Sequence, residues 1–207
     1  MAIDLVPILN PAHSAVLVFE CQEGLLDEAG PLPGLATAAR DSDLLGSIAA
    51  LVERARRRGV PVLYMTAAKR SAKEAGSSQS PLEKRIGKSG GEPFDPGSVC
   101  PEVAPQSGEP VFEREKGMTG FFESGLDELL EQRGIQAIVL VGISLNIGVV
   151  GTAIEAVNRG YSVVVPRDCV VGDPPEYGEQ VVRYSLRNMA VLSTSSDIAK
   201  AWEATGG

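Results

Sequence analysis

Apolar positions along the chain fall into six short runs that are rich in β-branched residues and are bounded by turn-forming residues. Such runs are typical of buried strands. They are continuous rather than alternating, which indicates strands buried on both faces, as in a parallel sheet. The predicted strands cover residues 14–21, 60–67, 109–115, 135–143, 161–170 and 190–194.

Between these runs, apolar residues recur at helical spacing. Helices are predicted over residues 41–59, 124–134, 151–160 and 174–190. The first opens near an Asp, carries Arg in its last turn and is followed by Gly59, a common helix-ending residue. Alternating strands and helices predict an α/β doubly wound fold: a mostly parallel, six-stranded sheet with helices on both faces, of Rossmann-like type.

Residues 68–108 interrupt this alternation. The segment is rich in Lys, Ser, Gly and Pro and begins at the carboxyl end of a predicted strand. A long irregular segment inside a compact domain is usually functional or disordered. The chain is therefore expected to form one domain over residues 1–207, with 68–108 either a lid or substrate-facing loop or an insertion with no role.

Composition and charge exclude several classes of function. The net charge of -8 leaves no basic surface for a nucleic-acid partner. No apolar run is long enough to span a membrane, and the N-terminus lacks the pattern of a signal peptide. Three scattered cysteines do not make a disulfide framework and fit a reducing compartment, so a cytoplasmic protein is expected. A single histidine, His13, leaves almost no material for a His-based metal site or a Ser-His-Asp triad.

Candidate chemistry lies where the predicted strands end. In a doubly wound sheet, ligands bind beyond the carboxyl ends of the strands, at the point where the strand order reverses. Glu20 and Gln22 end the first strand, and Lys116 and Thr119 follow the third. The stretch "GISLNIGVV", residues 142–150, follows the fourth and leads into a helix. A carboxylate, an ammonium group and a turn of small residues are therefore expected to converge.

The order and spacing of these segments resemble the isochorismatase-like, or cysteine hydrolase, superfamily. Nicotinamidases, N-carbamoylsarcosine amidases and true isochorismatases belong to it. The resemblance runs from Ala15 to about Thr194. Its segments are "AVLVFECQ", "KGMTGFFESGLDELLEQRGIQAIVLVGI" and "GISLNIGVVGTAIEAVNRGYSVVVPRDCV".

The resemblance implies a role for individual residues. The family Asp corresponds to Glu20 and the family Lys to Lys116, which lies three residues before Thr119, where many members have four. The nucleophilic Cys of the amidases corresponds to Gly148, which excludes thiol attack from that position. The metal-binding members need His and Asp ligands in the 50–95 region, where this chain has no His, so neither a metal nor another cofactor is expected.

True isochorismatases resemble this chain in carrying Gly at the nucleophile position. They hydrolyse a vinyl ether, which requires a general acid and charge stabilisation but no covalent nucleophile. Glu20 would be the acid: burial at a strand end raises a carboxyl pKa, whereas a nearby Lys116 lowers it. Backbone N–H groups around Asn146–Gly148, at a helix start, could hold an anionic substrate group. The substrate would contact Gln22, Thr119, Leu145, Asn146 and Gly148.

Three functions stay open at this point. The first is a cysteine-independent hydrolase with Glu20 as acid and Lys116 as electrostatic partner. The second is an inactive relative that binds a small molecule or a partner. The third is an amidase-like hydrolase with another nucleophile, for which Cys21 and Cys100 offer weak material; Ser144 lacks a His base and is interpreted as a turn residue. The resemblance also implies a small-molecule substrate and a homo-oligomer, a dimer or a tetramer.

Overall fold

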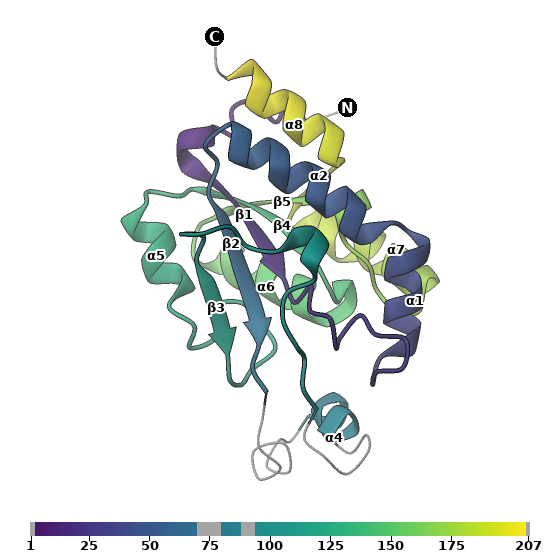
Figure 1. Ribbon diagram of the computed structural model, residues 1–207. Helices are drawn as coiled ribbons and strands as arrows, with labels where there is room; N and C mark the ends of the chain where they lie inside the picture. Colours follow the sequence, from purple (N-terminus) through teal and green to yellow (C-terminus); the bar gives the residue numbers. More distant parts are fainter. Residues whose placement is uncertain (1–2, 70–79, 88–93, 206–207) are drawn as a thin grey trace.

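The predicted α/β fold is confirmed. A computed structural model describes residues 3–69, 80–87 and 94–205, and Figure 1 shows its sheet between two layers of helices. Every pair of neighbouring strands is parallel, in the order β3-β2-β1-β4-β5-β6. The strands are β1 (Ser14–Phe19), β2 (Val62–Ala67), β3 (Val111–Arg114), β4 (Ala137–Gly142), β5 (Ser162–Pro166) and β6 (Val191–Ser193).

Helices follow the strands, with some differences from the predicted bounds. The helices are α1 (Pro33–Asp41), α2 (Leu44–Arg57), α4 (Pro81–Gly87), α5 (Leu126–Gln132), α6 (Val150–Asn158), α7 (Pro175–Tyr184) and α8 (Ser195–Ala204). The predicted 41–59 helix begins later, because Asp43 adopts a left-handed φ of 50° and separates α1 from α2. Helices α1, α4 and α8 were not predicted.

Alternate residues of each strand pack on opposite faces of the sheet, as strand geometry requires. Val16 and Val18 of β1 belong to the core beneath α2 and α8. Leu17 and Phe19 belong to the core beneath α5, α6 and α7. Figure 1 shows α2 and α8 side by side on one face, in agreement with their packing contacts. Both faces are therefore buried, which explains the continuous apolar runs of the sequence.

The strand order reverses between β1 and β4, where the last residues Phe19 and Gly142 are paired. Gly142 has a φ of 114°, and a Cβ there would lie 2.1 Å from the carbonyl oxygen of Phe19. The chain thus needs glycine where it leaves the sheet and approaches the end of β1. This reversal point fixes the position of the candidate site.

Among the described residues, no helix is long and apolar enough to cross a membrane.

Candidate active site

Glu20 lies immediately beyond β1, at the reversal point. Its backbone has a left-handed φ of 53°, and its N–H donates to the carbonyl of Met65 in β2 at 2.8 Å. A non-glycine residue in this conformation is uncommon and marks a position that the surrounding structure fixes. The conformation turns the chain out of the sheet directly after β1, and the Glu20 side chain is 19% exposed.

Arg114 is the cationic partner of Glu20. Its Nη2 donates to Glu20 Oε1 and its Nη1 to the carbonyl of Gly117. Arg114 is the last residue of β3 and pairs with Ala67 of β2, so its side chain can reach across the strand ends to β1. The side chain is only 5% exposed, and burial lowers the pKa of the guanidinium to about 10. Arg114 therefore stays charged at neutral pH.

Lys116, the cation expected from the sequence, lies outside this pair. Its side chain is 64% exposed, and its Nζ contacts Glu123 at 2.9 Å. It also lies 6.0 Å from the centre of the Phe122 ring. Strand β3 ends at Arg114, so Lys116 stands past the sheet edge and faces solvent. Arg114, two residues before Lys116 in the sequence, lies beside Glu20 instead.

Gly148 lies where the strand-to-helix turn faces the ring of Phe19. A Cβ at position 148 would be 2.4 Å from Cε1 of Phe19, a ring that is fully buried. The Arg114 guanidinium carbon lies 5.5 Å from the centre of the same ring. Phe19 therefore fills the space of a side chain at 148 and supports Arg114 by a cation–π contact.

The turn between β4 and α6 uses several of its polar groups internally. It contains a cis peptide bond between Ile143 and Ser144. The N–H of Leu145 donates to Val171, and that of Ile147 donates to the carbonyl of Ser144. The amide nitrogen of Asn146 donates to the carbonyl of Asp173 at 2.6 Å. The side chain of Asn146 and the buried Leu145 thus hold the turn, and the binding role of this stretch stays a prediction.

Gln22 and Thr119 also contact protein groups. Gln22 is buried; its amide nitrogen donates to the carbonyls of Ala67 and Gly97 at 3.0 and 2.8 Å. Its amide oxygen accepts from the N–H of Ala67 at 2.7 Å. Thr119 donates to Glu155 of α6 at 2.9 Å. Gln22 therefore links the end of β2 to Gly97 by hydrogen bonds. Thr119 links the segment after β3 to α6.

A cavity of about 140 Å³ lies beside these strand ends. Glu20, Arg114, Ser144 and Gly148 line it, whereas Lys116, Gln22, Thr119, Leu145 and Asn146 do not belong to its wall. The rest of the wall is mainly apolar. The described part of the predicted loop contributes Ala68, Leu82, Glu83, Ile86, Phe94 and Pro96. Residues 70–79 and 88–93 of that loop lie outside the described residues.

All three cysteines are buried and unpaired, and none belongs to the described wall of the cavity. Burial raises the pKa of the Cys21 and Cys169 thiols far above the ordinary value and that of Cys100 to about 11. Thiols in such surroundings are poor nucleophiles because the thiolate is the reactive form. Within the described residues, no group of three or more His, Cys, Asp or Glu side chains could hold a metal ion.

The fold and the site together define an α/β protein with a cavity and a partly buried Glu–Arg pair at the carboxyl ends of its strands. Residues 14–197 match the isochorismatase domain family. The chain therefore belongs to the isochorismatase family, within the cysteine hydrolase superfamily.

Three relatives illustrate this membership. The isochorismatase family protein YwoC of Bacillus subtilis is 35% identical over 116 residues, which span 56% of this chain and 60% of that protein. The ureidoacrylate amidohydrolase RutB of Azorhizobium caulinodans is 28% identical over 92% of this chain and 90% of its own length. The structure of N-carbamoylsarcosine amidase from Thermoplasma acidophilum superposes with a TM-score of 0.68 at 25% identity, covering 88% and 96% of the two chains.

Proposed function

We propose that this chain is a hydrolase of the isochorismatase family that works without a cysteine nucleophile and cleaves vinyl ethers. Glu20 is the general acid, and Arg114 takes the electrostatic role first expected for Lys116. The observation that carries the proposal is the Glu20–Arg114 pair, which lines the cavity next to Gly148. The Phe19 ring supports it, because it fills the space that a nucleophilic side chain at 148 would need.

The reaction balances with one carboxyl group and one water. The Glu20 carboxyl gives its proton to the terminal vinyl carbon, and the electron pair of the C=C bond forms the new C–H bond. The oxocarbenium ion that results is attacked by water, which returns a proton to Glu20. The hemiketal then breaks its C–O bond and releases a ketone and an alcohol. Acid–base catalysis of this kind typically contributes about two to four decades in rate.

A small-molecule binding module without turnover is the second candidate. One observation favours it: Glu20 and Arg114 are already paired, so the cavity holds an ion pair rather than a free acid. An ion pair that only shapes a binding cavity would have the same geometry as one that takes part in catalysis. The two candidates differ in whether a bound vinyl ether is consumed.

An amidase with another nucleophile is the third candidate, since relatives of this chain are amidohydrolases. Ser144 is the one hydroxyl-bearing side chain among the described residues of the cavity wall. His13, the only histidine of the chain, cannot act as a base for Ser144. It precedes the first residue of β1, at the opposite end of the sheet from the site, and its Nδ1 contacts the carbonyl of Gly134.

A substrate panel separates the three functions. Pyruvate release from 2-alkoxyacrylates, which are vinyl ethers, is measured beside ammonia release from ureidoacrylate. Turnover of vinyl ethers that survives Ser144→Ala supports the proposal. Amide turnover that disappears in Ser144→Ala supports the third candidate. Saturable binding of a vinyl ether with no product supports the second and contradicts the first.

We also propose that the chain forms a homo-oligomer through the outer face of α6. Ile154 and Val157 of α6 and Ile147 of the preceding turn are large apolar side chains left exposed. Ile154 and Val157 are three residues apart and so share a face of α6. Sedimentation equilibrium should show a dimer or tetramer that dissociates in Ile154→Glu. A monomeric wild-type protein would contradict this proposal.

A further inference from the structure

We propose that Thr152 and Glu155 of α6 are positioning residues for Arg114. They hold the segment 117–120 against α6, and this segment in turn fixes the guanidinium beside Glu20. The proposal rests on the proposed function, which gives Arg114 its electrostatic role, and it names the residues that set the position of that charge. Two hydrogen bonds from the segment to α6 and one from Arg114 to the segment carry it.

The guanidinium of Arg114 is held from two sides. Its Nη2 donates to Glu20 Oε1, and its Nη1 donates to the carbonyl of Gly117. Gly117 lies beyond the end of β3, where a φ of 83° turns the chain. A carbonyl on such a turn can orient a guanidinium only if the segment that carries it is itself held in place.

Two side chains of α6 hold this segment. The Oγ1 of Thr119 donates to Oε2 of Glu155 at 2.9 Å. The N–H of Gly120 donates to Oγ1 of Thr152 at 2.9 Å, in a buried contact. Thr152 and Glu155 are three residues apart and therefore lie on one face of the helix. The segment is thus joined to α6 by two neighbouring side chains.

The segment and the helix also pack closely. A Cβ at Gly151 would lie 2.7 Å from Cγ2 of Thr119. A Cβ at Gly120 would lie 3.1 Å from Cγ2 of Thr152 and 3.5 Å from Cε2 of Phe19. Small residues on both sides therefore let the segment lie directly against α6. Because closely packed groups transmit displacements, a shift of the segment also displaces the carbonyl that Arg114 uses.

The segment is part of the cavity wall, whereas the residues that hold it are not. Gly117 and Met118 line the cavity. Thr152 and Glu155 do not belong to the described wall, and Thr152 is only 1% exposed. A substitution at either position therefore acts on the site through the segment, which separates a positioning role from direct contact with a substrate.

Matched substitutions separate loss of a hydrogen bond from a change of shape. Thr152→Val removes the acceptor of the Gly120 N–H and keeps a branched side chain, whereas Thr152→Ser keeps the hydroxyl. Glu155→Met removes the acceptor of Thr119, whereas Glu155→Gln keeps an acceptor oxygen. We expect Thr152→Val and Glu155→Met to release the segment, and we expect Thr152→Ser and Glu155→Gln to behave as the wild type.

The measurement is the exchange of the Arg114 guanidinium protons with solvent. It is followed by NMR of protein labelled with 15N-arginine, at one fixed and mildly acidic pH, and the signal is assigned by its loss in Arg114→Lys. In the wild type these protons should be protected, since the side chain is only 5% exposed. In Thr152→Val they should exchange at least about fivefold faster, the lower end for loss of a buried hydrogen-bond partner.

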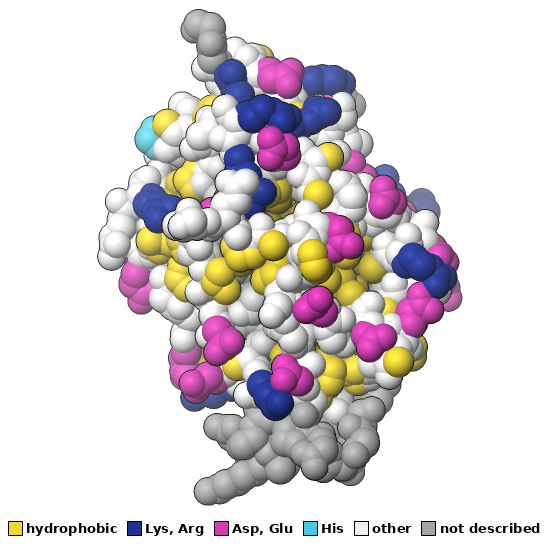
Figure 2. Space-filling view, viewed as in Figure 1, with side chains coloured by type: hydrophobic (Ala, Val, Ile, Leu, Met, Phe, Trp, Pro, Cys, Tyr) yellow, Lys and Arg dark blue, Asp and Glu magenta, His cyan; other side chains and the backbone are white. Residues whose placement is uncertain are grey.

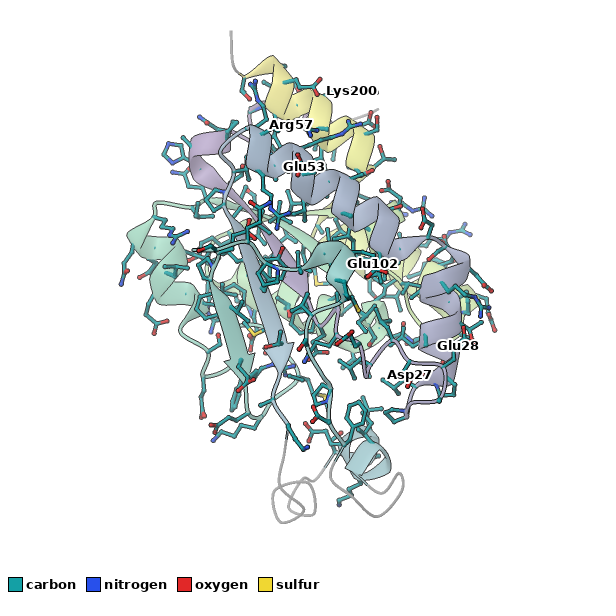
Figure 3. The ribbon with its side chains drawn as sticks, viewed as in Figure 1. Asp27, Glu28, Glu53, Arg57, Glu102 and Lys200 are labelled. Carbon is teal, nitrogen blue, oxygen red and sulfur yellow. The ribbon has the colours of Figure 1, made fainter. Side chains whose placement is uncertain are left out.

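Two exposed arginines serve as references in the same spectra. Arg57 pairs with Glu53 and Arg167 pairs with Glu179, and all four side chains are more than half exposed. Figure 3 shows Arg57 and Glu53 on α2, and Figure 2 shows the Lys and Arg side chains gathered on that part of the surface. The exchange of the Arg57 and Arg167 protons should be equally fast in every variant.

A matched structural control is Tyr161→Phe. It removes the hydrogen bond of 2.7 Å from Tyr161 to Asp127 of α5. Tyr161 precedes the first residue of β5, at the end of the sheet away from the site. The exchange of the Arg114 protons should therefore stay at the wild-type rate. Equal acceleration in Tyr161→Phe and Thr152→Val would mean that general loosening is the cause, and would overturn the proposal.

Wild-type exchange of the Arg114 protons in both Thr152→Val and Glu155→Met also overturns the proposal, because the segment would then not hold the guanidinium. If Thr152→Val does not fold, Glu155→Met still decides, since position 155 is partly exposed. Exchange as expected, with no hydrolysis of a vinyl ether by the wild type, would instead defeat the proposed function alone.

Discussion

The ring of Phe19 stands 2.4 Å from the point where a Cβ at position 148 would be, and a guanidinium lies 5.5 Å from the centre of that ring. Phe19 is thus packed between Gly148 and Arg114. The last residue of β1 occupies the space that a side chain at position 148 would need and also supports the cation that pairs with Glu20. The close approach of Phe19 to Gly148 and the support of the Glu20–Arg114 pair therefore belong to one arrangement.

Gly148→Ala tests the contact between Phe19 and position 148. Overpacking of this kind costs about 1–3 kcal/mol of stability, offset by up to about 1 kcal/mol from the higher helix propensity of Ala. Because Phe19→Val removes the obstructing ring, the cost of Gly148→Ala should fall in that background. Denaturant unfolding of the wild type, both single variants and the double variant gives this coupling. Strict additivity would show that the two positions do not compete for space.

Arg114→Met tests the buried pair. Removing one partner leaves the Glu20 carboxylate without its counter-charge, which should cost about 3 kcal/mol, the lower end for buried pairs because Glu20 is partly exposed. Lys116→Met and Arg167→Met remove exposed pairs and should change stability by less than about 0.5 kcal/mol. The midpoint of urea unfolding is the measurement. Equal losses for Arg114→Met and Lys116→Met would contradict the assignment of Arg114.

The buried thiols make stability fall at high pH. Burial raises the pKa of Cys100 from the ordinary value of 9.0 to about 11, and it raises those of Cys21 and Cys169 further. Above pH 9 the thiols of the unfolded chain lose protons that the folded chain keeps. The contribution of the thiols to the free energy of unfolding is therefore fully present below about pH 9 and is lost as pH rises through 11.

The three single Cys→Ala variants, unfolded in urea across this pH range, check the thiol contribution. Each should show a shallower loss of stability between pH 9 and 11 than the wild type. A pH dependence unchanged in all three variants would rule out the thiols as its source. Iodoacetamide at neutral pH should label none of them before unfolding, as counted by mass spectrometry.

Gln22→Ala tests the hydrogen bonds that link the end of β2 to Gly97. Removing the amide leaves the part-buried Ala67 N–H and two carbonyls without their partner, which should cost about 1–3 kcal/mol. Amide exchange at Ala67 should accelerate, while Gln132→Ala, at the exposed end of α5, should leave both measurements unchanged. Unaltered protection of Ala67 in Gln22→Ala would mean that the side chain does not hold the strand end.

The sheet could be predicted from the sequence because its strands are apolar on both faces and therefore appear as continuous runs. The strand-ending position of Glu20 and the turn around Gly148 followed from the same pattern. Helices α1 and α8 were missed because Ala makes up much of the face that each one buries, which gives little contrast between their faces. The extent of each element was less well predicted than its existence.

The partner of Glu20 could not be assigned because it depends on where β3 stops. Counting back from Thr119 selects Lys116, but the strand ends at Arg114 and the chain turns at Gly117, which has a φ of 83°. The available signal was Arg114 itself, a charged residue within the predicted third strand, which is otherwise half-exposed. The contact between Phe19 and Gly148 has no sequence signal, since it depends on how β1 and the turn after β4 approach each other.

Cysteine-independent catalysis through Glu20 is tested most directly by the initial rate of pyruvate release from 2-phenoxyacrylate, a vinyl ether, in three preparations: wild type, wild type treated with iodoacetamide, and Glu20→Gln. We expect the same rate for the first two and a loss of about two to four decades in the third. A rate abolished by alkylation, or preserved in Glu20→Gln, would contradict cysteine-independent catalysis through Glu20.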